Sequence, residues 1–157
     1  MNKYKIAVSP FYIPEGKLLP GDPRWPKFNG SFHNREMTPP DLLNVIYAGS
    51  AITTHHKNHW RATKNFLLGQ YIGLDFDSED KDSDINNLKS DKFIRKYASF
   101  IHTTLSHTLE TPRARVIFLL DEPIYQAKNY ALGATALLWL FGAADRQCKD
   151  AVRFFYG

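Results

Sequence analysis

The sequence predicts an α+β protein built on one antiparallel sheet, and three observations indicate this. Residues 71–77, Tyr-Ile-Gly-Leu-Asp-Phe-Asp, alternate in polarity at period two, as a strand with two different faces does. Residues 115–120 are rich in β-branched and aromatic side chains, which favour a second strand. Helical sequence follows each of these two stretches. From residue 66 onward, the order of elements is then β-α-β-β-α-β.

Composition limits the class of protein. The 157 residues are 43% hydrophobic and 23% charged, which is typical of one globular domain. The net charge of +4 permits a polyanionic partner without identifying one. Cys148 is the only cysteine, so an internal disulfide and a cysteine-rich zinc site are excluded. The first residues lack the apolar run of a secretory signal. The most apolar segment, 130–144, is too short for a membrane span, and we expect it to form a buried helix. We therefore expect a cytoplasmic protein without a membrane partner.

Residues 1–60 are expected to form an N-terminal β/α extension of this single domain. A first strand over 5–13 leads into a long loop that cannot be regular because of its prolines and glycines: Pro14, Gly16, Pro20, Gly21, Pro23 and Pro26. A loop of this length is expected to be functional or packed over a surface. Thr38 before Pro39-Pro40-Asp41 predicts a helix N-cap, with the helix ending near Gly49 and a short strand following at 51–54.

Residues 66–157 are expected to form a palm-like core. The expected strands are 71–77, 99–104, 115–120 and 152–156, and the expected helices are 84–97, with a second cap at Ser90-Asp91, and one opened by Pro123. This order is the ferredoxin-like arrangement, which the polymerase palm and the RNA-recognition fold share. One antiparallel sheet would carry both helices on one face and leave the other face open.

Asp75 and Asp77 belong on the open face, because the apolar side chains of Ile72, Leu74 and Phe76 must point to the other face and pack against the helices. Two carboxylates two residues apart on one strand face lie roughly 6 to 7 Å apart at their Cα atoms. Such close like charges are costly unless a cation lies between them, and hard divalent cations prefer oxygen ligands. The pattern therefore indicates a metal-binding catalytic edge. The alternative is a strand that ends in an acidic turn.

Further polar side chains are expected at the same rim of the sheet. Ser106 and His107 follow the second strand of the core, and Arg113 and Arg115 begin the third. Because the first two strands run parallel and the hairpin returns the chain, these residues should lie beside the two acids. Carboxylates for metal ions and cations for phosphates are what phosphoryl transfer requires. The alternatives are a loop histidine bonded to backbone and arginines that pair with acids on the surface.

A third acid would complete the carboxylate cluster. Asp150 directly precedes the expected last strand, and Asp145 lies five residues earlier. In this topology the last strand lies beside the first, so either acid could reach the site. We expect Asp150 to do so, with Asp145 left open.

A basic stretch precedes the acidic strand. His55 and His59 have helical spacing without the glutamate of a metalloprotease motif, so they are a weak zinc signal. The nearby Lys57, Arg61 and Lys64 instead favour a contact with nucleic acid.

These residues resemble a known family. Gly73-Leu74-Asp75-Phe76-Asp77 is similar to the hydrophobic-Asp-hydrophobic-Asp motif of the archaeo-eukaryotic primase (AEP) superfamily, the primase-polymerases. Ser106-His107, followed by Arg113-Ala114-Arg115, stands where that family has a Ser-x-His motif, although Ser and His are adjacent here and Arg115 occupies the strand position where the family's His often lies. Residues 145–157 resemble the third-motif region of primase-like proteins from bacteria, phages and mobile elements. The resemblance covers residues 55–157.

The resemblance implies a nucleotidyltransferase that acts as a DNA primase or a template-dependent polymerase. Asp75, Asp77 and Asp150 would hold two Mg²⁺ or Mn²⁺ ions. The implied nucleotide-binding residues are Ser106, His107, Arg113, Arg115 and Arg153. The implied partners are nucleoside triphosphates, a DNA template and primer, and a helicase or other replication region in cis or in trans. Both a fragment of a longer protein and a minimal catalytic module are compatible with a chain that stops after an expected strand.

Two other functions are compatible with the same architecture. A rolling-circle replication initiator or other metal-dependent nuclease would need a His-hydrophobe-His strand motif, which the sequence lacks. A non-enzymatic RNA-recognition-type module would need aromatic side chains, not carboxylates, on the open face.

Overall fold

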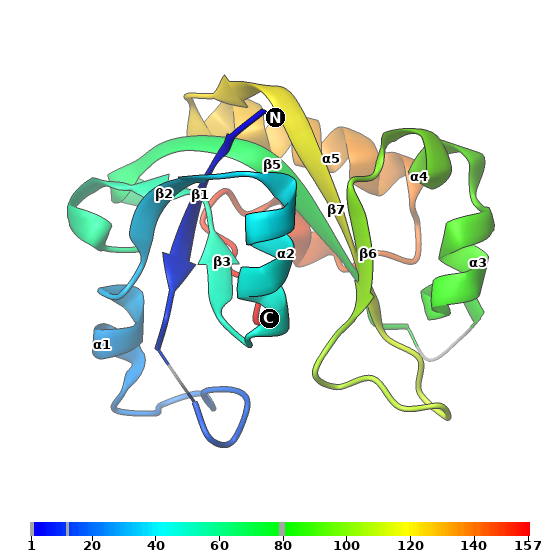
Figure 1. Cartoon of the computed structure of the whole chain (residues 1–157), viewed down its shortest axis with the longest axis horizontal. Coiled ribbons are helices and arrows are strands. Elements are labelled where there is room, and N and C mark those ends of the chain that lie inside the picture. The colour runs from blue at the N-terminus through cyan, green and yellow to red at the C-terminus, as the bar shows by residue number, and fades with distance from the viewer. Residues whose placement is uncertain (1, 12, 79–80) are drawn as a thin grey trace.

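Residues 71–76 of the alternating stretch belong to β5 (Phe66–Phe76), which lies in the larger of two sheets, and Asp77 follows directly after this strand (Figure 1). The structure is a computed structural model that describes residues 2–11, 13–78 and 81–157. The first sheet has the order β2-β1-β3 and comprises β1 (Tyr4–Ser9), β2 (His33–Met37) and β3 (Ala51–Thr53). The second has the order β4-β5-β7-β6, where β4 is His55–His56, β6 is Phe100–Thr103 and β7 is Ala114–Ile124. All strand pairs in both sheets are antiparallel. The expected α+β class with an antiparallel sheet is therefore confirmed.

The described residues form five α-helices, and two of them begin at a cap that the sequence indicates. They are α1 (Trp25–Asn29), α2 (Pro39–Tyr47), α3 (Ile85–Ser90), α4 (Lys92–Tyr97) and α5 (Ala127–Leu140). Thr38 and Asp41 form a capping box at the start of α2. Asp91 accepts hydrogen bonds from the next turn and so separates α3 from α4, as the second cap predicts.

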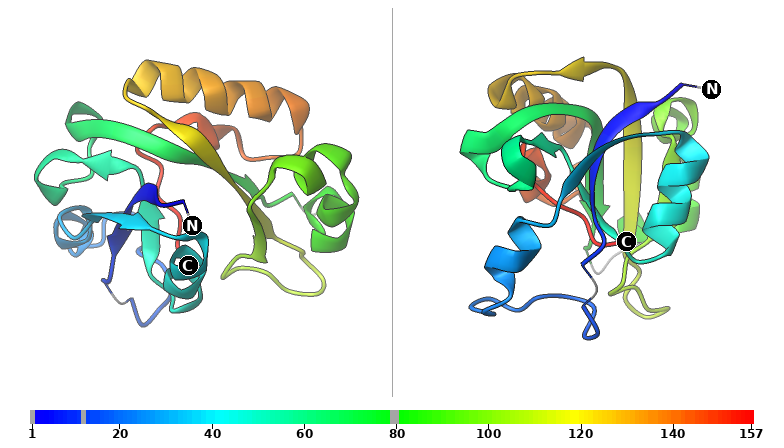
Figure 2. Two further views of the ribbon diagram at one scale, coloured as in Figure 1. Left: turned by 45° about the horizontal axis from the view of Figure 1, so that its top comes forward. Right: turned by 60° about the vertical axis from the view of Figure 1, so that its left-hand side comes forward.

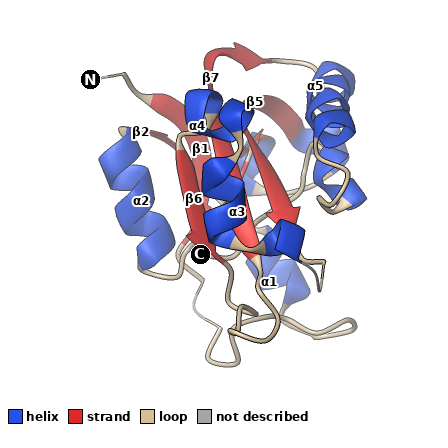
Figure 3. Ribbon diagram, turned by 90° about the vertical axis from the view of Figure 1, so that its right-hand side faces the viewer, coloured by secondary structure: helices blue, strands red, loops and turns tan. Residues whose placement is uncertain are grey.

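Helices cover one face of the second sheet, as Figure 2 shows for α5 above β5 and β7 and Figure 3 for α3 and α4 beside β6. The ring of Phe93 in α4 lies 6.1 Å from that of Phe118 in β7 and 5.9 Å from that of Phe141 after α5. Phe141 also contacts Phe76, with ring centroids 5.9 Å apart. The apolar half of the alternating stretch in β5 therefore faces the helices.

The opposite face of this sheet is open at only one end, which corrects the expected open face. The ring of Phe155, near the C-terminus, lies directly over Gly73. The side chain of Gln70 joins the two sheets, because it accepts from the N–H of Lys5 in β1 and donates to the carbonyl of Leu120 in β7. The end of β5 that carries Asp75 remains accessible.

Three expectations about individual elements are wrong. The long loop expected to lack regular structure contains α1, with Pro26 in its first turn, where a proline is tolerated, and it also contains β2. Residues 152–156 are all described and form no strand beside β5; Phe155 makes one isolated bridge to Ile52 of β3, and β4 occupies the position beside β5. Pro123 does not open a helix but lies within the far end of β7, where the register with β5 is irregular. A proline is tolerated at such a position because no ladder hydrogen bond is required from it.

The most apolar segment forms α5, and this helix is only half buried. Tyr130, Ala134 and Leu138 face the sheet, whereas Trp139 is 82% exposed and Leu132 is 60% exposed. The expectation of a buried helix therefore holds for the face toward the sheet and is wrong for the outer face. Within the described residues, no helix combines the length and the apolar character needed to cross a membrane.

We expect Gly73→Ala to lower the free energy of unfolding by about 1–3 kcal/mol, because overpacking a filled core forces neighbours to move. A Cβ atom at Gly73 would lie 2.7 Å from the Phe155 ring and 3.2 Å from Ile117. The matched control is Gly142→Ala, where a Cβ would meet no described heavy atom within 4 Å. Urea denaturation of both variants gives the comparison. Equal unfolding midpoints would contradict the packing of Phe155 on Gly73.

Candidate functional site

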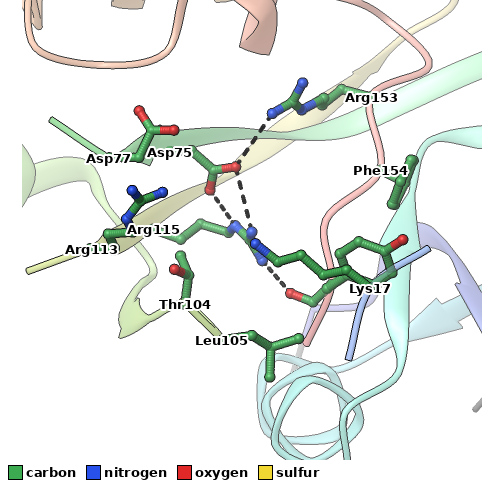
Figure 4. A pocket seen from close by; sticks show the side chains of 10 residues that line it. Lys17, Asp75, Asp77, Thr104, Leu105, Arg113, Arg115, Arg153 and Phe154 are labelled. Atoms are coloured by element: carbon green, nitrogen blue, oxygen red, sulfur yellow. Dashed lines mark hydrogen bonds and ion pairs between the residues drawn. The ribbon is translucent and has the colours of Figure 1, made fainter. Parts of the chain in front are cut away.

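A pocket of about 230 Å³ opens at the end of β5, between the two sheets' loops (Figure 4). It carries four cationic side chains, two carboxylates, and aromatic and hydroxyl groups. The lining residues are Lys17, Asp75, Asp77, Thr104, Leu105, Arg113, Arg115, Arg153, Phe154 and Tyr156. The sequence predicts five of these, namely both acids and the three arginines.

Asp75 is held through both its backbone and its side chain. Its N–H donates to the Cys148 thiol at 3.3 Å, and its carbonyl accepts from the N–H of Asp145 at 2.8 Å. Its carboxylate accepts from Arg115 Nε at 2.6 Å. Arg115 stands directly opposite Asp75 in the β5–β7 register, so the pair is a cross-strand contact.

The guanidinium of Arg115 makes further contacts inside the protein besides its ion pair with Asp75. A second nitrogen donates to the carbonyl of Tyr156, and the plane lies over the Phe155 ring at 4.7 Å. Only 7% of the side chain is exposed. Arg115 therefore ties the C-terminal segment to β5 and fixes the direction of the Asp75 carboxylate.

Arg153 connects Asp75 to a second acid. Its Nη2 lies 2.9 Å from Asp145 Oδ2 and 3.7 Å from Asp75 Oδ2, and its Nη1 donates to Gln147. This side chain is 27% exposed, so it is freer to move than that of Arg115. Arg115, Asp75, Arg153 and Asp145 form a continuous chain of alternating charges.

The third acid that the structure brings to Asp75 is Asp145. Ala144 bridges Phe76 at the end of β5, which places Asp145 beside Asp75. Asp150, which the sequence favours, is exposed and caps a turn by accepting from the N–H of Val152. Because the last segment does not pair along β5, Asp150 is not carried to the pocket.

The side chains of Asp77 and Arg113 have fewer partners among the described residues than those of Asp75, Arg115 and Arg153. Asp77 is exposed and makes no hydrogen bond or ion pair through its carboxylate with any described residue. Arg113 lines the pocket, and its guanidinium makes no ion pair within the described part of the chain.

His107 and Ser106 lie outside the pocket lining. His107 Nδ1 accepts a hydrogen bond from the backbone N–H of Arg113 at 3.0 Å, so His107 organises the hairpin rather than lining the pocket. Ser106 lies at the rim, where its hydroxyl accepts from Lys17 Nζ at 2.6 Å.

Lys57, Arg61 and Lys64 do not form one exposed basic group. Lys57 and Lys64 are exposed. Arg61 instead bonds to Asn29 Oδ1 and to the carbonyl of Val152, and its guanidinium lies over the Phe154 ring at 4.6 Å. Burial lowers the pKa of Arg61. The structure therefore uses Arg61 as an internal tie, which leaves only the two lysines of the expected nucleic-acid contact facing solvent.

His55 and His59 do not face one another, so the expected weak zinc signal is not supported by their placement. His55 Nε2 lies 3.0 Å from the carbonyl of Arg35. The ring of His59 packs against that of His33, with centroids 4.9 Å apart. Among residues 2–11, 13–78 and 81–157, no group of three or more His, Cys, Asp or Glu side chains is arranged to hold a metal ion.

Sequence reasoning misses five of the ten lining residues, among them Lys17, and it also misses His102. Lys17 comes from the long proline-rich loop, whose length is a signal of function without saying which residue matters. His102 stands opposite Arg115 in the β6–β7 register, so Asp75, Arg115 and His102 form one row across three strands. Its Nε2 is buried and has no hydrogen-bond partner in the described structure, and burial, with Arg115 nearby, lowers its pKa. The polar positions of the 100–104 stretch could have indicated His102.

Comparisons with known proteins give one structural likeness. No family model matches the sequence, and no curated protein matches it. The AEP domain of the cyanophage S-2L primase-polymerase (PrimPol) is similar in structure, with a TM-score of 0.48 and 10% sequence identity over 99% of this chain and 71% of that one. What the pocket can do therefore has to follow from its own side chains.

We expect Arg115→Ala to lower the free energy of unfolding by about 3 kcal/mol, because it leaves the partly buried Asp75 carboxylate without its close partner. Arg95→Ala on α4 is the control, since this arginine is exposed and makes no ion pair with described residues. Adding Asp75→Asn to Arg115→Ala should recover part of the loss in a double-mutant cycle. A loss no larger than that of Arg95→Ala would contradict the role of this pair.

Stability should also fall in acid because of His56. Burial, then Arg61 and His55, lowers the pKa of His56 from 6.5 to about 4. The folded state then binds fewer protons than the unfolded state between these values, so the free energy of unfolding decreases as the pH falls through this window, by up to about 3 kcal/mol. We expect His56→Gln to flatten this dependence in urea titrations from pH 7 to pH 4. The exposed His59→Gln is the control, and an identical pH profile for all three proteins would refute this prediction.

Proposed function

We propose that the protein is a nucleotidyltransferase that binds a nucleoside triphosphate in the pocket at the end of β5 and adds it to a DNA strand under the direction of a template. The observation that carries this proposal is the composition of the pocket, where Asp75 and Asp77 share one strand end with four cationic side chains. Acids to bind metal ions beside cations to bind phosphates are the groups that phosphoryl transfer needs. The resemblance of the 73–77 stretch to the acidic motif of the primase-polymerases supports the same activity.

The donor set suits Mg²⁺ or Mn²⁺ in its chemistry. Asp75, Asp77 and Asp145 offer the oxygen ligands that hard cations prefer. Asp77 is the acid with no cationic partner among the described residues, whereas Asp75 and Asp145 share Arg153. We propose these three carboxylates as the metal ligands, with Asp145 in place of the expected Asp150. In the described structure they are not arranged around one metal position, so the proposal requires Arg153 to leave Asp75 and Asp145 when a metal ion binds. Bound ions, two in the mechanism that the resemblance implies, would lower the pKa of the attacking hydroxyl and neutralise charge on the leaving pyrophosphate.

The three arginines have different roles in this proposal because they differ in burial and in their ion-pair partners within the protein. Arg115 is almost fully buried and held by the Phe155 ring and the Tyr156 carbonyl, so it positions Asp75. Arg153 is more exposed and can exchange a carboxylate for a phosphate. Arg113 has no acidic partner in the described chain and is a direct phosphate ligand. Ser106 and His107 lie at the rim and within the hairpin, so they support the loop rather than contact the phosphates first.

Template and primer DNA are the proposed macromolecular partners. Lys57 and Lys64 are exposed and can contact a phosphate backbone, which Arg61 cannot do while it holds Asn29 and Val152. A helicase or other replication region, in cis or in trans, remains part of the proposal from the resemblance alone.

The test is primer extension on a primed template with Mn²⁺ or Mg²⁺ and either dNTPs or NTPs. We expect Asp77→Asn and Asp145→Asn each to reduce the extension rate by 100-fold or more, on the order of what loss of transition-state charge stabilisation costs. Asp150→Asn is the matched control and should stay within about threefold of the parent protein, because its carboxylate only caps a turn.

The outcomes separate the candidate functions. A folded, metal-binding protein that gives neither extension nor dinucleotide synthesis would sink the proposal. Cleavage of single-stranded DNA without added nucleotides would favour a nuclease. Nucleic-acid binding that is unchanged by EDTA and by the double variant Asp75→Ala with Asp77→Ala would favour a non-enzymatic binding module.

A further inference from the structure

Lys17 enters the pocket from a part of the chain that no motif marks. It lies in the loop between β1 and α1, and its ammonium group donates to the Ser106 hydroxyl at 2.6 Å (Figure 4 shows its place among the lining residues). Ser106 belongs to the hairpin between β6 and β7, 89 residues further along the chain. One hydrogen bond therefore connects two loops across the rim of the pocket.

The backbone on both sides of Lys17 is held in place. Gly16 has a φ of +82° in a turn closed by its N–H on the carbonyl of Ile13 at 2.8 Å. Leu18 is buried, and its N–H donates to the Tyr156 hydroxyl at 3.1 Å. A Cβ atom at Gly16 would lie 3.9 Å from the side chain of Leu105 in the opposite hairpin, so the two loops are close together here. A side chain whose backbone is fixed in this way loses less entropy when it binds a ligand.

The charges in the pocket are unequally neutralised. Arg115 and Arg153 pair with Asp75 and Asp145. Within the described residues, neither Lys17 nor Arg113 makes an ion pair; the polar partner of Lys17 is the neutral hydroxyl of Ser106. Exchanging a neutral hydroxyl for a phosphate oxygen turns an ordinary hydrogen bond into a charge-assisted one, which is roughly twice as strong.

We infer that Lys17 binds the phosphates of the incoming nucleoside triphosphate and that Ser106 holds its ammonium group in position until the nucleotide arrives. This inference rests on the proposed function and names a further binding residue for it. A compact triphosphate suits the site better than a strand backbone, because Lys17 and Arg113 line one pocket of about 230 Å³ rather than a track along the surface.

The experiment measures binding of inorganic tripolyphosphate and of dGTP by calorimetry, at low and at moderate salt, for the parent protein, Lys17→Ala, Lys17→Arg and Lys128→Ala. Lys128 is an exposed lysine on α5, so Lys128→Ala makes the same change in net charge outside the pocket. We expect Lys17→Ala to weaken both ligands about tenfold, as the loss of one charge-assisted hydrogen bond predicts. Lys17→Arg should restore most of the affinity, and Lys128→Ala should match the parent protein.

Extension assays on the same proteins test the role further. In Lys17→Ala the KM for nucleotide should rise about tenfold while kcat changes little, because the contact is made in the ground state as well as in the transition state. A merely structural lysine would instead lower thermal stability together with Ser106→Ala and leave KM unchanged.

The two proposals fail in different ways. Binding of tripolyphosphate that depends on Lys17, in a protein without extension activity, would leave this inference standing and remove the proposed function. Extension with an unchanged KM in Lys17→Ala would overturn the inference and keep the function. Weaker binding of a single-stranded oligonucleotide, with unchanged tripolyphosphate affinity, would also overturn it and assign Lys17 to the strand backbone.

Discussion

The ion pair between Asp75 and Arg115 organises the rest of the site. It joins β5 to β7 at the level where the acidic stretch ends, with Nε and Oδ1 2.6 Å apart. Because both side chains are largely buried, removing either partner would leave a charge without compensation. The same guanidinium reaches the carbonyl of Tyr156 and the Phe155 ring, so the pair also decides where the C-terminal segment lies. Phe155 can approach the sheet this closely only because residue 73 has no side chain.

The pair also divides the charges of the pocket into two parts. The inner part, where Arg115 and Arg153 meet Asp75 and Asp145, is nearly neutral and strongly hydrogen-bonded. The outer part keeps cationic groups that no described acid neutralises. An anion is therefore attracted to the rim, while the two carboxylates are held in direction by their arginines. Under the proposed function, this separation would let one small pocket hold both the carboxylates and a polyphosphate without strong repulsion between them.

Local patterns in the sequence predict the elements that local physics determines. The alternation in 71–77 assigns Asp75 to the face away from the helices, and the Thr38 and Asp91 caps begin α2 and α4. The failures come from long-range contacts that outweigh local preference. Residues 152–156 have strand-like composition, but Phe155 packs on Gly73 and Arg115 takes the Tyr156 carbonyl, so the segment bridges β3 rather than β5. Asp150 consequently caps a turn, and Asp145 is the acid that lies beside Asp75. Nothing local to Lys17 shows that its loop meets a hairpin 89 residues away.

Arg153 pairs with the carboxylates of Asp75 and Asp145, and under the proposed function it also binds a phosphate. Its guanidinium cannot serve Asp75, Asp145 and a phosphate equally, since each would take the same Nη2 group. Any ligand that neutralises the two carboxylates makes Arg153 available to an anion, and any anion that draws Arg153 away exposes the carboxylates to a cation. Linkage requires that these two effects be equal in free energy. Arg115, fixed by the Phe155 ring, does not take part in this exchange and keeps Asp75 oriented throughout. Under the proposed function, a cation and a polyphosphate would therefore favour each other's binding, because Arg153 moves between the carboxylates and the phosphate while Arg115 stays in place.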